Sequence, residues 1–168
     1  MQKDFERLFH RAEDHYLHPL EMISFKKHLG LLEQRLVAYR TLRDQEGLIF
    51  QAVADQLEAA YPDRPVTELE NALLHWISIL RYGSMAMLLS NPEYLQYRLL
   101  EWLGDMVKAQ EQQDVESRLV ELLTVQLQGV LSPEGFELLQ PFLAQAEQTV
   151  LGRVPAQQTE PAILGEQV

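Results

Sequence analysis

The chain has no cysteine. This absence excludes disulfide bonds, thiolate nucleophiles, zinc sites with thiolate ligands, and cofactors joined to the protein by a thioether bond. Basic residues are also scarce, because 14 Lys and Arg stand against 25 Asp and Glu, which gives a formal charge of −11. Phosphate binding needs a basic surface, so nucleic acid is not an expected partner.

Targeting and catalytic signatures are lacking as well. The N-terminal residues contain no apolar core of the signal-peptide type, which favours a cytoplasmic protein. The sequence shows no P-loop, no dinucleotide-binding glycine set, no nucleophile elbow and no HExxH motif. We therefore expect a protein that is not an enzyme.

What is present is typical of a folded helical chain. Of the 168 residues, 46% are hydrophobic and 23% are charged, which is the composition of a globular domain. Apolar residues repeat every three or four positions and no β pattern occurs, so the predicted fold class is all-α. The first predicted helices cover residues 1–16, 20–46 and 48–60, with a bend at Gly47 and a loop imposed by Pro62 and Pro65.

A long apolar helix follows this loop. Thr67 and Glu70 have the spacing of a capping box, which predicts where the helix begins. Its apolar residues form one stripe, composed of Leu69, Leu73, Trp76, Leu80, Gly83 and Met87. His75 and Arg81 interrupt the apolar run, so burial inside the protein is a better interpretation than a membrane span.

Further start signals divide the rest of the chain. Asn91 with Pro92 and Ser132 with Pro133 each predict the beginning of a helix. A polar stretch at 108–114 separates the helix that begins at Asn91 from a helix over 115–128. The last helix begins at Ser132 and runs to residue 151. We expect a single domain over 1–151 and a flexible C-terminal tail over 152–168.

Four segments carry a resemblance to a known family. They are Tyr-Leu at 16–17, Ala-Val-Ala-Asp-Gln at 52–56, Ile-Leu-Arg-Tyr-Gly-Ser-Met-Ala at 79–86, and Gly-Val-Leu-Ser-Pro-Glu-Gly-Phe at 129–136. In order and spacing they resemble landmarks of the phycobiliproteins, over roughly residues 1–151. The resemblance implies a globin-like fold with an N-terminal helical extension that pairs two protomers.

The resemblance also implies a site for a linear tetrapyrrole, or bilin. Family members attach this pigment through a cysteine, and Ala72 stands at that position here, so covalent attachment is impossible. The arginine and aspartate that grip the pigment in the family are replaced by Leu74 and His75. An imidazole can hydrogen-bond a pyrrole N–H or a lactam carbonyl, but it cannot neutralise a protonated bilin as a carboxylate does.

Two hypotheses of different class follow from the resemblance. In the first, the chain is a carrier or accessory protein that binds biliverdin or phycocyanobilin noncovalently, with a site composed of Ala72, His75, Trp76, Ile79 and Tyr94. In the second, it is a pigment-free interaction or assembly subunit, either a homodimer or paired with a related chain. Glu13 or Asp14 of one protomer would then pair with Arg81 of the other.

Two metal-containing alternatives have less support. A haem-binding globin would use His75, but no histidine follows Asn91, where a proximal ligand would be sought. His10, Glu13, Asp14, His15 and His18 have the composition of a zinc site, yet Pro19 follows at once and no fourth ligand is evident. The sequence therefore predicts no bound metal.

Overall fold

The computed structural model describes residues 3–110 and 113–152. Within these ranges the chain is helical and contains no strand, which confirms the all-α class. The helices are α1 (Lys3–Asp14), α2 (Pro19–Ala60), α3 (Val66–Leu89), α4 (Pro92–Leu95), a π-helical segment η1 (Gln96–Leu100), α5 (Glu101–Gln110), α6 (Gln113–Val130) and α7 (Pro133–Leu151). The predicted flexible tail, apart from Gly152, lies outside the described residues.

Helix α2 is the longest element, with 42 residues and a length of about 63 Å at 1.5 Å per residue. The bend expected at Gly47 is wrong, because the helix continues through this residue. A glycine inside a helix costs only about 1 kcal/mol relative to alanine. On either side of it Leu42, Ile49 and Phe50 are buried in the core, so packing holds the helix together here.

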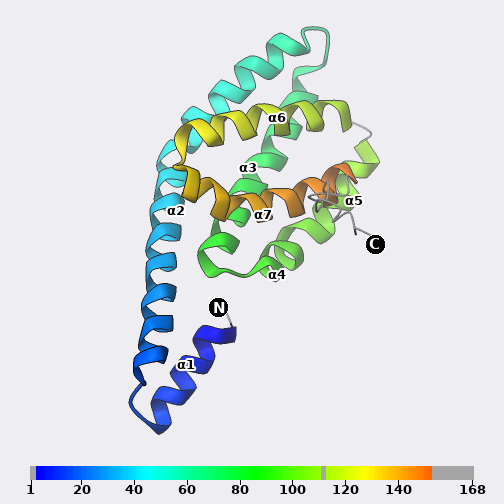
Figure 1. The fold of residues 1–168 in the computed structure, drawn as a ribbon. Helices are drawn as coiled ribbons and strands as arrows, with labels where there is room; N and C mark the ends of the chain where they lie inside the picture. The colour runs from blue at the N-terminus through cyan, green and yellow to red at the C-terminus, as the bar shows by residue number, and fades with distance from the viewer. Residues whose placement is uncertain (1–2, 111–112, 153–168) are drawn as a thin grey trace, which may run out of the picture.

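The N-terminal part of α2 leaves the helical body and forms an arm with α1. Figure 1 shows α1 folded back beside the first half of α2, below the body that the other helices form. We call residues 3–36 the arm. Several large apolar side chains of the arm are exposed, among them Tyr16, Leu20, Ile23, Leu29 and Leu32. The arm therefore contributes little to the core.

Helix α3 lies at the centre of the body, where α2, α6 and α7 all contact it (Figure 1). The predicted stripe is confirmed, since Leu69, Trp76, Leu80, Gly83 and Met87 are buried, and Leu73 is half-buried against the core. These residues recur every three or four positions and thus share one face of the helix. The apolar face of α3 is the wall on which the other helices pack.

The predicted helix starts have different outcomes. Asn91 accepts a hydrogen bond from the backbone N–H of Tyr94 at 3.2 Å, and Ser132 accepts one from that of Gly135 at 3.1 Å, so both caps are confirmed. The capping box at Thr67 is wrong, because α3 begins at Val66 after Pro65 and has no side-chain cap. Proline fixes φ in the helical range, and the helix starts two residues too early for that box.

Helix α3 is also long and apolar enough to cross a membrane by length and composition. Half of its most apolar 18-residue window is buried inside the body. The central helix of a water-soluble protein has the same length and composition.

Candidate functional site

Four of the five residues expected to bind a pigment lie together on the buried face of α3. Ala72, Trp76 and Ile79 have no exposed surface, and His75 is 7% exposed. Tyr94 is the fifth, and it lies on α4, where it packs against the edge of the core. The structure thus separates the predicted site into a buried cluster and one tyrosine beside an open cleft.

The buried cluster is organised by Glu116 of α6, whose side chain is completely buried. His75 Nδ1 lies 2.9 Å from Glu116 Oε1, and Trp76 Nε1 donates to Glu116 Oε2 at 2.5 Å. One acidic side chain therefore gives a buried partner to one ring nitrogen of each of two neighbouring residues of α3.

Sequence reasoning missed Glu116, although a signal for it exists. The residue lies on the same helical stripe as Val115, Leu119 and Leu123, all of which are buried. An acidic residue in such a stripe needs a hydrogen-bond partner inside the protein. His75 and Trp76, on the other apolar helix, are residues of the right type for this role.

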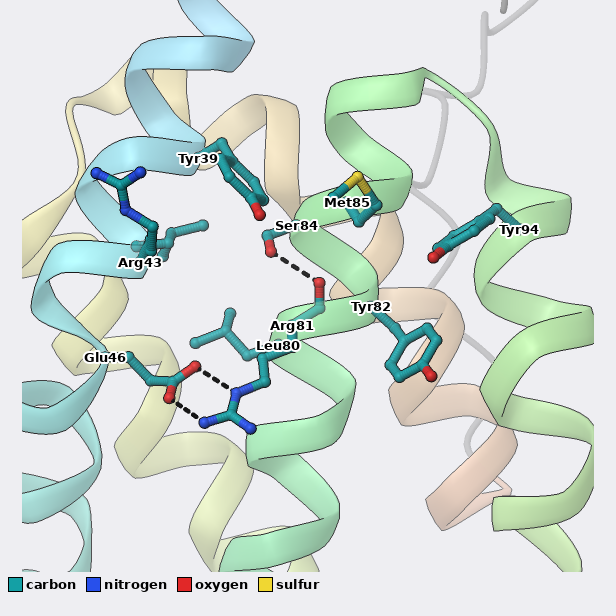
Figure 2. Close-up of a pocket in the computed structure, with 10 residues that line it drawn as sticks. Tyr39, Arg43, Glu46, Leu80, Arg81, Tyr82, Ser84, Met85 and Tyr94 are labelled. Carbon is teal, nitrogen blue, oxygen red and sulfur yellow. Dashed lines mark hydrogen bonds and ion pairs between the residues drawn. The ribbon is translucent and has the colours of Figure 1, made fainter.

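An open cleft lies between α2, α3 and α4 (Figure 2). Its volume is about 440 Å³. Ten residues line it: Tyr39, Leu42, Arg43 and Glu46 from α2, Leu80, Arg81, Tyr82, Ser84 and Met85 from α3, and Tyr94 from α4. Of the predicted pigment residues, only Tyr94 belongs to this lining.

Arg81 crosses the cleft and forms a two-pronged ion pair with Glu46 of the same chain. Its Nε and Nη2 atoms donate to the two carboxylate oxygens at 2.8 and 2.6 Å (Figure 2). The hydrogen bond from Arg81 lowers the pKa of Glu46, and the same bond raises the pKa of Arg81. Sequence reasoning paired Arg81 with Glu13 of a second protomer and did not identify Glu46.

The aromatic side of the cleft is formed by Tyr82 and Tyr94. Their ring centroids lie 6.1 Å apart and their planes are inclined by 28°. Met85 is next to them in the lining. Arg43 and Arg81 also line the cleft, and each is paired with a carboxylate of the same chain, Arg43 with Asp44 at 2.7 Å and Arg81 with Glu46. The cleft thus combines flat apolar surfaces with guanidinium groups, which bind carboxylates.

The predicted interface residues of α1 lie on the arm and are exposed. Glu13 is 3.8 Å from His10 on the same helix, and Asp14 is the last residue of α1. On the same arm, α2 carries Met22, Leu29, Leu32 and Leu36, each between 36% and 43% exposed. Their spacings of seven, three and four residues place them on one face of the helix. We call this set the arm stripe.

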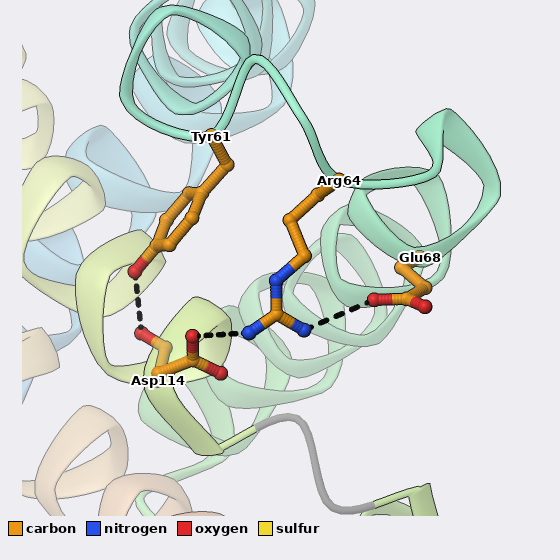
Figure 3. Close-up of polar contacts among 4 residues, drawn as sticks. All are labelled: Tyr61, Arg64, Glu68 and Asp114. Carbon is orange, nitrogen blue, oxygen red and sulfur yellow. Dashed lines mark hydrogen bonds and ion pairs between the residues drawn. The ribbon is translucent and has the colours of Figure 1, made fainter.

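A polar cluster at the other end of α2 fixes the loop to α3 (Figure 3). Arg64 donates to Asp114 Oδ2 at 2.6 Å and to Glu68 Oε2 at 3.2 Å, and the hydroxyl of Tyr61 donates to the backbone oxygen of Asp114 at 3.1 Å. These contacts join the loop to the first turn of α6. They position the helix that carries Glu116.

No protein-family model matches this chain, and no curated protein matches it either.

Proposed function

We propose that the chain is a non-catalytic interaction subunit with a globin-like, phycobiliprotein-like arrangement of helices, and that it pairs with a second copy of itself through the arm. The observation that carries the proposal is the arm stripe. Met22, Leu29, Leu32 and Leu36 face solvent on a helix that leaves the body. Aligned apolar side chains of this kind mark interaction surfaces more often than isolated ones do.

The cleft and the arm of a second copy are complementary. Tyr39 follows Leu36 by three residues and lines the cleft, so the arm stripe leads into it. The cleft presents Arg43 and Arg81, whereas the end of α1 carries Glu13 and Asp14. In a two-fold dimer each arm meets the cleft of the other copy, because such an interface uses the same surfaces twice.

In that dimer two carboxylates would be able to pair with Arg81. Within the chain Glu46 pairs with Arg81, and Glu13 of the second copy would share or replace this contact. Exposed ion pairs contribute at most about 1 kcal/mol, so the apolar stripe supplies most of the affinity and the charges fix the orientation.

Analytical ultracentrifugation over a wide concentration range tests the pairing. We expect the natural chain to dimerise and Leu32→Glu to weaken dimerisation at least tenfold, which corresponds to about 1.4 kcal/mol. Val125→Glu is the matched control, because Val125 is an exposed apolar residue of α6, outside the arm. A natural chain that stays monomeric, or two variants that behave alike, would contradict the proposal.

Noncovalent binding of a bilin is the second candidate function, and the open cleft beside Tyr94 and Met85 favours it. A linear tetrapyrrole is flat and carries two propionates, so it would lie against Tyr82 and Tyr94 with its carboxylates at Arg43 and Arg81. His75 would act on the ligand only by exchanging its bond to Glu116.

Absorption titrations with biliverdin, phycocyanobilin and haem test this candidate. We expect a saturable band shift with a bilin that Tyr94→Ala weakens, because the ring forms one wall of the cleft. Tyr97→Ala is the control, since Tyr97 is exposed on η1 and absent from the lining. A shift with haem alone would favour a haem-binding globin, and no shift with any of the three would remove the candidate.

A further inference from the structure

The turn between α1 and α2 brings two histidines and a glutamate together at the tip of the arm. One ligand atom from each of His15, His18 and Glu21 lies within 4.8 Å of the others. The centroids of the two imidazole rings are 5.0 Å apart. Glu21 is the third ligand that the sequence did not reveal, because the turn at 15–18 has to reverse the chain before this side chain can reach the histidines.

His15 is oriented as a metal-binding imidazole is. Its Nδ1 atom is 2.9 Å from the backbone oxygen of Tyr16. A carbonyl oxygen only accepts hydrogen bonds, so Nδ1 is the donor of this bond, and in the neutral ring with this tautomer Nε2 is the nitrogen with the lone pair. A backbone carbonyl on the second ring nitrogen is a common way in which proteins fix the ring and the tautomer of a histidine ligand.

Glu21 is held in place as a carboxylate. The backbone N–H of His18 donates to its Oε2 at 2.9 Å, and Arg11 donates to its Oε1 at 3.0 Å. The bond from His18, helped by the bond from Arg11, lowers the pKa of Glu21 below its ordinary value of 4.5. Each carboxylate oxygen has a further lone pair, so these hydrogen bonds orient the group and leave it able to bind a cation.

We infer that His15, His18 and Glu21 bind one divalent transition-metal ion, of which Zn²⁺ fits best, with water in the open position. Two imidazoles and one carboxylate suit zinc, whereas Ca²⁺ and Mg²⁺ prefer sets made only of oxygen. Zinc holds such ligands at about 2.0–2.2 Å, so the three atoms have to move closer together on binding. His15 and His18 are exposed, so small adjustments of the side chains can bring the ligand atoms closer. The inference does not depend on the proposed pairing.

Zinc titration of the full chain in competition with a chromophoric chelator tests the site. We expect one Zn²⁺ per chain at neutral pH. His15→Ala and His18→Ala should each lower the affinity at least tenfold, since loss of an outer partner alone costs about 10–100-fold. His10→Ala is the matched control, because His10 is an exposed histidine of α1 outside the cluster.

Two further measurements decide the type of site. Glu21→Gln should also weaken zinc binding, and Mg²⁺ should not compete at equal concentration. Absence of saturable binding would overturn the inference, as would an equal loss in His10→Ala, which would show diffuse binding by surface histidines.

Discussion

Glu116 is the hydrogen-bond partner of the polar residues on the buried face of α3. Its two oxygens hold His75 and Trp76, and none of the three residues is more than 7% exposed. Sequence reasoning placed His75 and Trp76 at the wall of a ligand site on the basis of their positions in α3. In the structure their polar atoms have a partner within the protein, so they also stabilise the contact between α3 and α6.

Replacement of Glu116 should destabilise the fold strongly. We expect Glu116→Ala to lower the free energy of unfolding by about 3–5 kcal/mol, because the indole N–H and the imidazole lose their buried partner. Glu116→Gln should cost less, since its amide oxygen can still accept one of the two bonds. Urea denaturation followed by circular dichroism measures both values.

The matched control is Glu121→Ala on the same helix. Glu121 is exposed and pairs with Arg118 at 2.9 Å, so its loss should cost less than about 1 kcal/mol. Similar values for Glu116→Ala and Glu121→Ala would show that the buried bonds do not contribute to stability.

At the scale of elements, two glycines inside helices have opposite roles. Gly47 lies in α2, and a Cβ atom there would meet nothing within 4 Å. Gly104 lies in α5, where a Cβ atom would come 2.8 Å from Cγ2 of Thr149 in α7. Thr149 is β-branched and its hydroxyl donates to the backbone oxygen of Gln145, so it cannot move aside easily. Gly104 therefore permits the close crossing of α5 and α7.

The two Gly→Ala substitutions should change stability in opposite directions. Gly47→Ala should raise the free energy of unfolding by about 0.4–1 kcal/mol, because alanine favours the helix and has room. Gly104→Ala should lower it by about 1–3 kcal/mol through overpacking. Thermal unfolding of both variants under the same conditions checks the signs, and a stabilising Gly104→Ala would refute the close crossing.

For the whole molecule, the arm and the net charge have opposing effects on association. The arm presents apolar side chains that favour pairing, whereas the formal charge of −11 makes two copies repel each other. Salt screens this repulsion and leaves apolar burial in place. The local attraction between acidic α1 and the arginines of the cleft is exposed, so it is screened as well.

Dimerisation should therefore tighten when sodium chloride is raised from a low level to about 0.3 M, where the screening length is well under 10 Å. Sedimentation equilibrium at several salt concentrations measures the change. Leu32→Glu, which adds charge and removes apolar surface, should still associate less than the natural chain at each concentration. Dissociation on addition of salt would instead show that the ion pairs dominate the interface.

The sequence by itself determined the class of the fold, most helix boundaries and the buried stripe of α3. These features depend on the periodicity of apolar residues and on helix caps such as Asn91 and Ser132. Periodicity and caps are both set by residues that are close together in the sequence. The phycobiliprotein-like arrangement remains a proposal that rests on four short segments. The sequence did not determine that α2 continues through Gly47. The free-energy cost of a glycine inside a helix is small, and core contacts of the residues on either side of it outweigh that cost.

Only the tertiary structure decided which polar side chains meet. Glu116 with His75, Glu46 with Arg81, and Glu21 with His15 all join different helices or opposite sides of a turn. No local pattern specifies such pairs, because the separation along the chain says nothing about the distance in space until the helices are packed. The sequence therefore identified candidate polar residues such as His75 and Arg81, and the packing of α2, α3 and α6 determines which side chains they pair with.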